Sequence, residues 1–311
     1  MRLNRMGLLG MGLLKDIRSW RRGAKLQRRL RDLTGTLVIV TGAGSGIGRE
    51  TALAFAAEGA IVVVCDIDLE SAQDTAALVN SPARAGGAEA VFGGGAHAYH
   101  VDVSDEQAMI RFAETVAAHH GVPDIVVNNA GIGFSGTFAD TTVAQFERVM
   151  NINFWGVVYG CRAFSPMMIE RGSGGHIVNL SSAAAYTPQK ALTAYSTSKA
   201  AVFMLSDCLR AELLPHGIGV STICPGIVDT NIVKTTEFAG TTAAEQLRNQ
   251  TKADNFYRRR NFTPDRVANA IVKAVRTNKA IVPVTAEAKL GYRLSRFYPS
   301  SMRVGARINA L

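Results

Sequence analysis

The stretch LVIVTGAGSGIG, residues 37–48, decides the fold of this chain. The aliphatic run 37–40 predicts a buried strand, and 49–58 has a helical pattern. The glycines between them let the backbone turn tightly and approach a pyrophosphate, whose charge suits the N-terminus of the next helix. The spacing is G-x-x-x-G-x-G and not the usual G-x-G-x-x-G, so the turn alone is a weak signal of a nucleotide site.

Strand and helix signals alternate from this turn onward. Further strands are expected at 61–65, 98–101, 125–127, 176–180 and 219–223, with helical patterns between them at 69–79, 139–161 and 193–214. Strands joined by helices of this length imply right-handed crossovers and a parallel sheet covered on both faces. The predicted fold class is α/β: a doubly wound, Rossmann-like parallel sheet in a single domain, 34–287, with basic extensions at 1–33 and 288–311.

The composition is that of an ordered globular protein. The chain has 311 residues, of which 47% are hydrophobic and 19% charged, and this excludes disorder. Its apolar runs are strand-sized, far below the roughly 20 residues that cross a bilayer. The four cysteines form no CxxC pair and the six histidines lack ligand spacing, so no metal site is predicted. Scattered thiols of this kind indicate a reducing, cytoplasmic environment.

The net charge of +9 is concentrated at the two ends of the chain. Residues 1–31 carry ten Lys or Arg and 288–311 carry five, whereas residues 33–287 carry 19 basic and 23 acidic residues. A nucleic-acid binder needs a basic face on its folded module, and this segment does not supply one. Contact of the basic ends with anionic lipid or a partner is favoured, and plain solubilising tails are the alternative.

The segment 10–30 has the pattern of a basic amphipathic helix. Its apolar stripe includes Leu14, Ile17 and Trp20, and its cations fall largely on the other faces. That arrangement is typical of an interfacial helix and of peripheral membrane association. A transit peptide and a helix that packs on its own protein are the alternatives.

Asp66 ends the second predicted strand, about twenty residues beyond the glycine turn, where a carboxylate can bind the adenosine ribose hydroxyls. It would also repel a 2′-phosphate. We expect Arg49, the nearest cation, to face solvent, so NAD(H) is favoured over NADP(H).

Tyr195 and Lys199 are spaced i and i+4, which places a phenol and an ammonium on one face of a helix. The unperturbed pKa of tyrosine is near 10. A neighbouring cation favours the phenolate and lowers that pKa, which suits general acid–base catalysis. The pair by itself occurs often by chance.

Taken together, the motifs resemble the short-chain dehydrogenase/reductase family over residues 35–276. The resemblance consists of TGAGSGIG (41–48), Asp66, Asp102-Val103, NNAG (128–131), Asn153 in NINFWG, Ser182 thirteen residues before Tyr195, and PGIVDT (225–230). Two features depart from the family pattern: the loop 80–95 is long, and the basic ends are additional.

The resemblance implies a role for each matching residue. Tyr195 would be the general acid–base, Lys199 would bind the nicotinamide ribose and lower the Tyr195 pKa, Ser182 would bind the reacting oxygen, and Asn153 would hold a helix irregularity and a water. The cofactor would contact Gly42, Ser45, Gly46, Ile47, Gly48, Asp66, Asp102, Val103, Asn128, Asn129, Ala130, Gly131, Tyr195, Lys199, Pro225, Gly226, Val228 and Thr230. Family members are commonly dimers or tetramers, so a homodimer or homotetramer is expected.

The expected reaction interconverts an alcohol and a ketone or aldehyde. The resemblance implies that residues 231–262 form the substrate lid. We expect the cations 258–260 in this lid to be solvated, and we expect Tyr186 to form part of the wall of the substrate pocket. The apolar and basic ends favour a lipophilic substrate at a membrane surface. Two alternatives stay open: a ketoacyl-thioester reductase that uses NADPH, and a non-catalytic dinucleotide-binding scaffold.

Overall fold

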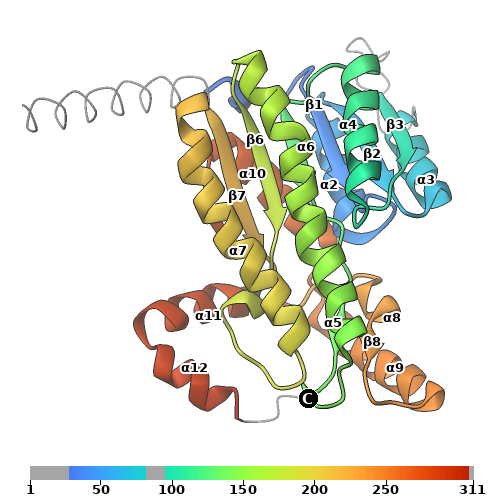
Figure 1. Cartoon of the computed structure of the whole chain (residues 1–311), viewed down its shortest axis with the longest axis vertical. Coiled ribbons are helices and arrows are strands. Elements are labelled where there is room, and N and C mark those ends of the chain that lie inside the picture. Colours follow the sequence, from blue (N-terminus) through green and yellow to red (C-terminus); the bar gives the residue numbers. More distant parts are fainter. Residues whose placement is uncertain (1–27, 82–94, 308–311) are drawn as a thin grey trace, which may run out of the picture.

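A computed structural model describes residues 28–81 and 95–307 (Figure 1). Its centre is a seven-stranded sheet in the order β3-β2-β1-β4-β6-β7-β9, with all neighbouring strands parallel. The strands are β1 (Leu37–Thr41), β2 (Ile61–Asp66), β3 (Ala96–His100), β4 (Ile125–Asn128), β6 (Gly175–Leu180), β7 (Ile218–Cys224) and β9 (Ile281–Pro283). The predicted doubly wound α/β fold is confirmed. The strand order reverses between β1 and β4, which creates the crevice where such sheets bind ligands.

Helices cover both faces of the sheet, as expected for parallel strands. One face packs against α2 (Gly46–Ala57), α3 (Leu69–Asn80) and α10 (Pro264–Thr277), and the other against α4 (Glu106–His119), α6 (Gly156–Arg171) and α7 (Thr193–Leu213). Side chains alternate along a strand, so in β1 Val38 and Val40 join the first core and Leu37 and Ile39 the second.

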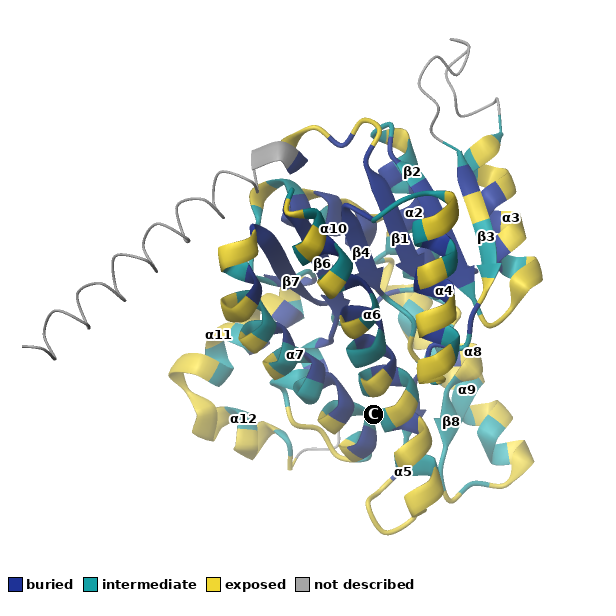
Figure 2. Ribbon diagram, turned by 45° about the horizontal axis from the view of Figure 1, so that its top comes forward, coloured by how far each residue is buried: buried dark blue, intermediate teal, exposed yellow. Residues whose placement is uncertain are grey.

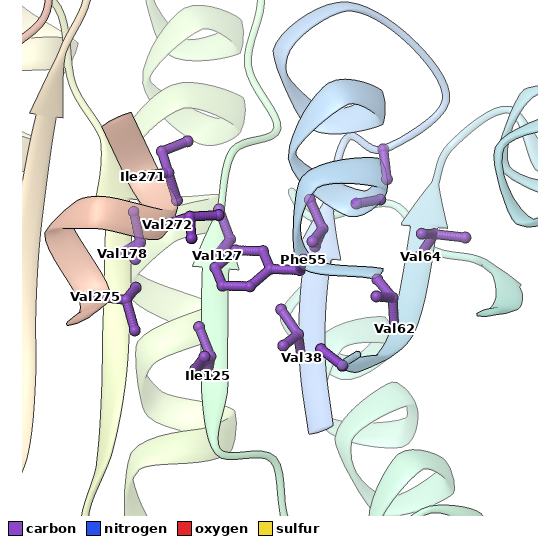
Figure 3. Packing of buried hydrophobic residues seen from close by; sticks show 14 of the residues in the cluster. Val38, Phe55, Val62, Val64, Ile125, Val127, Val178, Ile271, Val272 and Val275 are labelled. Carbon is purple, nitrogen blue, oxygen red and sulfur yellow. The ribbon is translucent and has the colours of Figure 1, made fainter. Parts of the chain in front are cut away.

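The first core is centred on Phe55 of α2. Figure 3 shows its ring beside Val38 and Val127 of the sheet, with Ile271 of α10 across from it. Burial of a large apolar side chain stabilises the fold by about 1.5–3 kcal/mol. Figure 2 shows the strands almost wholly buried and the outer helix faces exposed. The sheet is therefore a rigid frame for the loops at its carboxyl end.

Several predicted boundaries change in the structure. The single helix expected at 139–161 is α5 (Val143–Met150), a π-helical turn η3 (Asn151–Trp155) and then α6. Helix α2 begins at Gly46, inside the glycine turn, and strand β9 was not predicted. Residues 82–94 of the long loop and 10–27 of the predicted N-terminal helix lie outside the described residues.

Shorter elements complete the description. They are η1 (Arg28–Arg31), β5 (Phe134–Ser135), η4 (Ala183–Ala185), η5 (Leu214–His216), α8 (Ile232–Thr235), β8 (Glu237–Phe238), α9 (Ala243–Arg260), α11 (Ala286–Phe297) and α12 (Pro299–Gly305). Strands β5 and β8 pair in parallel, and Leu30 and Leu33 pack into the first core. Over residues 28–81 and 95–307, no helix has the length and apolarity to cross a membrane.

Candidate active site

Four loops that carry the sequence motifs meet at the carboxyl end of the sheet. They follow β1, β4, β6 and β7, which are four consecutive strands in the sheet order. The Asn129 side-chain amide donates to the carbonyl oxygens of Thr41 and Gly42 at 2.9 and 3.0 Å. A Cβ on Gly46 would lie 3.4 Å from Thr230 Cβ. The β1 turn is thus tied to the β4 loop and bordered by the β7 loop.

The glycine turn has room only for glycine at two points. Gly42 has φ +61°, and a Cβ there would lie 2.7 Å from Ala130 Cα. A Cβ on Gly48, in the first turn of α2, would lie 2.1 Å from the Gly42 carbonyl oxygen. Close backbone packing here leaves the N-terminus of α2, with its free N–H groups, directed at the crevice, which suits a phosphate.

Asp66 lies beside this turn, as predicted. Its carboxylate accepts from the backbone N–H of Gly44 at 2.8 Å and of Asp68 at 3.1 Å. The expectation that Arg49 faces solvent is wrong, because the guanidinium folds inward and donates to the Gly44 carbonyl and, at 3.0 Å, to Thr75 Oγ1. The adenosine end of the crevice therefore has one negative and one positive side chain.

The NNAG segment divides between the two faces of the sheet. Asn128 is 2% exposed and donates to Asn179 Oδ1 at 2.8 Å on the α6 side. Its side chain therefore braces β4 against β6. Asn129 faces the glycine turn, and a Cβ on Gly131 would lie 3.3 Å from Lys199 Nζ. Lys199 thus packs directly beneath the chain at Gly131.

Asn153 lies in the π-helical turn and is fully buried. Its amide accepts from Ile132 N–H at 2.8 Å, donates to Ile132 C=O at 3.0 Å and donates to Ser198 Oγ at 3.3 Å. The widened turn lets this side chain reach the β4 loop, a use typical of π-bulges at functional sites. The predicted helix irregularity is present at the predicted residue.

Ser182, Tyr195 and Lys199 lie together between η4 and the first turns of α7. Ser182 hydrogen-bonds the Tyr195 phenol. Lys199 is 5% exposed, its Nζ donates to the Leu180 carbonyl at 3.0 Å, and it lies 5.8 Å from the centre of the Tyr195 ring. The neighbouring Ser181 instead donates to the Lys199 carbonyl at 2.7 Å, which agrees with the choice of Ser182.

The electrostatics of this cluster differ from the simple expectation. Burial raises the pKa of Tyr195 to about 12, and the hydrogen bond from Ser182 opposes that rise only in part. Burial also lowers the pKa of Lys199 to about 8. Desolvation disfavours both charged forms. The net shift of the Tyr195 pKa is therefore upward, opposite to the predicted direction, because burial outweighs any lowering by the Lys199 cation.

The other residues predicted to contact the cofactor lie in the loops after β1, β3 and β7 and in the first turn of α2. The Asp102 carboxylate caps its own loop by accepting from the Ser104 N–H at 2.8 Å. Val103 packs against Gly156, where an added Cβ would lie 2.9 Å from Val103 Cγ2. The Pro225 carbonyl accepts from Ala183 N–H at 2.8 Å and thereby joins the β7 loop to the Ser182 loop. Ser45 is exposed, Ile47 and Gly226 are partly buried, and Val228 is 4% exposed.

Glu287, in the first turn of α11, is a residue that the sequence analysis missed. It accepts from the Ile227 backbone N–H at 3.1 Å and lies 3.8 Å from Arg260 at the end of α9, within the segment predicted to be the substrate lid. Thr285 before it caps α11, a helix-start pattern that is readable in the sequence. Its contact with the β7 loop had no sequence signal.

Tyr186 is a contact of α11 and not simply a pocket wall. Its phenol donates to the Ala288 carbonyl at 3.0 Å, and its ring lies 5.4 Å from that of Tyr292. A second missed tyrosine, Tyr257 of α9, lies near enough to Tyr195 to add slightly to the rise in the Tyr195 pKa.

The arrangement suits acid–base chemistry without a metal ligand set. Within the two described ranges, His, Cys, Asp and Glu side chains nowhere gather in groups of three that could hold a metal ion. A phenol with a hydroxyl partner and a buried ammonium can donate, hold and return a proton.

Comparisons with known proteins agree with this geometry. A family model described as short chain dehydrogenase matches residues 36–240. "Probable oxidoreductase EphD" of Mycobacterium tuberculosis is 54% identical over 278 residues, which are 89% of this chain and 45% of that protein. The chain thus spans about half the length of that relative.

Two solved structures are also similar. A short-chain dehydrogenase/reductase from Burkholderia phymatum in complex with NAD has TM-score 0.75 and 26% identity, covering 88% of this chain and 96% of that one. A 7α-hydroxysteroid dehydrogenase complexed with NADH and 7-oxo glycochenodeoxycholic acid has TM-score 0.67 and 30% identity, covering 81% and 93%.

Proposed function

This chain belongs to the short-chain dehydrogenase/reductase family, and we propose that it interconverts a lipophilic alcohol and its ketone or aldehyde with NAD(H). The observation that carries the proposal is the cluster of Ser182, Tyr195 and Lys199 beside the crevice between β1 and β4.

The residues at the crevice fit a dinucleotide. The turn at Gly42 and Gly48 has no space for a Cβ, so its backbone can approach a pyrophosphate closely. Asp66 would accept from the adenosine ribose, and the inward Arg49 is engaged by Gly44 and Thr75. The Asp66 carboxylate and the engaged Arg49 guanidinium both support NAD(H) over NADP(H). When bound, the dinucleotide supplies or accepts the hydride.

Tyr195 moves the proton. Its raised pKa keeps the phenol protonated at neutral pH, so it can donate to a carbonyl oxygen during reduction. The Ser182 hydroxyl donates a hydrogen bond to the same oxygen and stabilises its developing charge. Lys199, with a pKa of about 8, still carries a proton at neutral pH and favours the phenolate that remains.

A lipophilic substrate is supported by the surroundings of the site. Helix α9 of the proposed lid presents Leu247 and Phe256, which are 66% and 38% exposed, and Tyr257 of the same helix lies near enough to Tyr195 to affect its pKa. The structurally similar 7α-hydroxysteroid dehydrogenase binds a steroid ketone. A homodimer or homotetramer stays a prediction.

The test is a Tyr195→Phe variant of the full chain, assayed on a panel of long-chain and steroid-like alcohols and ketones by NADH absorbance. Loss of the acid–base group is expected to lower turnover by at least about a hundredfold, while NADH binding, followed by fluorescence, stays unchanged. Turnover of the variant close to that of the parent would refute the mechanism.

A matched Tyr159→Phe variant is the control. Tyr159 lies on α6 with its ring stacked 5.8 Å from that of Trp155, so this variant should keep full turnover. A parent that binds NADH without converting any substrate would favour the scaffold alternative. A strong preference for NADPH and ketoacyl thioesters would favour the reductase alternative.

A further inference from the structure

We propose that α11 and α12, here called the C-terminal arm, dock the active-site end of the molecule on an anionic lipid bilayer. The proposal rests on the proposed function only through its consequence, the access of a lipophilic substrate from the membrane. The packing, charge and position of the arm carry it.

Helix α11 packs on the protein through its small residues. Ala288 is fully buried and Gly291 is buried, and a Cβ on Gly291 would lie 2.7 Å from Thr187 Cγ2. The phenol of Tyr186 bonds the Ala288 carbonyl on the same side. The close approach at Gly291 fixes which stripe of the helix faces the body.

Two large apolar residues of α11, Leu290 and Phe297, consequently face outward, and Leu294 between them is half-buried. Leu290, Leu294 and Phe297 recur at i, i+4 and i+7 and form one stripe. Leu290 is 59% exposed and Phe297 77%. A surface helix normally buries such a stripe in its own core. Here the stripe continues to Tyr298, which is 66% exposed, and to Val304 of α12, which is 58% exposed. Figure 2 shows α12 as mostly exposed surface.

The charge of the arm indicates an anionic partner. Residues 286–307, the arm and the two residues after it, contain one acid, Glu287, and five cations. All five cations are exposed: Lys289, Arg293, Arg296, Arg303 and Arg307. Apolar and aromatic side chains flanked by cations are the composition of a helix that lies in the headgroup region of an anionic membrane. In a symmetric contact, the arm of a second copy would bring like charges together.

The arm lies at the mouth of the site. Its first turn holds Glu287, which bonds the β7 loop at Ile227 and pairs with Arg260 of the lid helix. Figure 1 shows α11 and α12 at the same end of the molecule as α8 and α9. Docking through the arm would therefore place lid and crevice against the bilayer.

The experiment compares the full-length parent with a Leu290→Ser/Phe297→Ser variant in vesicle co-sedimentation. Vesicles of phosphatidylcholine with phosphatidylglycerol should bind the parent, and the variant should bind them at least tenfold more weakly. Vesicles of phosphatidylcholine alone should bind the parent weakly because the arm is cationic. A control, Leu78→Ser/Met204→Ser, removes exposed apolar residues from α3 and α7 and should bind like the parent.

Undiminished binding of the arm variant would overturn the proposal. So would a parent dimer that dissociates in the variant, seen by sedimentation velocity, while vesicle binding stays unchanged. That result would assign the stripe to a second copy. Turnover of a short, water-soluble alcohol tests the proposed function separately, because the arm variant should retain it. Arm-dependent vesicle binding by a chain without turnover would leave docking intact and refute the reaction.

Discussion

Replacing Asn153 by alanine tests how the site is held together. The amide is fully buried and satisfies both backbone groups of Ile132, at 2.8 and 3.0 Å. It also donates to Ser198 Oγ at 3.3 Å. Alanine removes all three bonds from an interior position and leaves a π-helical turn with no side chain to occupy its opening.

The expected cost follows from the groups left unpaired. A buried backbone donor or acceptor without a partner costs about 1–3 kcal/mol, so the loss of two such bonds to Ile132 predicts a destabilisation of about 2–6 kcal/mol. At roughly 2 °C per kcal/mol for a chain of this size, Tm should fall by about 4–12 °C. A looser β4 loop also releases Gly131 from Lys199, so we expect kcat to fall at least about tenfold, a barrier change of about 1.4 kcal/mol.

Thermal unfolding followed by calorimetry measures the first effect, and steady-state turnover of the best substrate in the panel measures the second. Ser198→Ala is the matched control, because it removes one weaker partner of Asn153 and leaves both bonds to Ile132. Its Tm should fall by only about 2 °C. An Asn153→Ala variant with the same Tm as the Ser198→Ala control would refute the reasoning.

Two further predictions concern buried polar groups. Burial lowers the pKa of Lys199 from 10.5 to about 8, so the folded state releases this proton at lower pH than the unfolded chain, and parent stability gains from this group as pH rises from 8 toward 10. Lys199→Met removes this buried amine, so its free energy of unfolding in urea, relative to that of the parent, should be most favourable below about pH 8 and become less so above it. A difference in unfolding free energy that does not change with pH would contradict the lowered pKa. Gly160→Ala places a Cβ 2.1 Å from Asn128 Oδ1, and overpacking of about 1–3 kcal/mol should exceed the gain of about 1 kcal/mol in helix propensity. A rise in its Tm would show that Asn128 moves freely.

Much of the fold was predictable because its signals are local. The strand 37–40, the glycine turn and the helix after it are each determined by neighbouring residues, and the structure places them within a few positions of the prediction. Strand β9 was missed because Ile281–Pro283 is too short to show a period. It becomes a strand only through its pairing with β7.

The residues at the site could be predicted from the sequence, but the directions in which their side chains point could not. NNAG was expected to face the cofactor as a block, yet Asn128 ends β4 and points to α6 while Asn129 points to the turn. Side chains alternate along a strand, so the register of β4 decides between them. The inward fold of Arg49 likewise depends on Thr75 of the next helix, a partner 26 residues away.

The spacing of Tyr195 and Lys199 shows where pattern and environment separate. A separation of four residues on a helix fixes which two side chains are neighbours, and the structure brings them together. The sign of a pKa shift depends also on how completely the surrounding elements exclude water. Here Leu180, Ser182 and the chain at Gly131 enclose the pair, so burial outweighs the attraction between the charged forms. The motif therefore predicts a proton-transfer pair, whereas the enclosure sets the protonation state from which it starts.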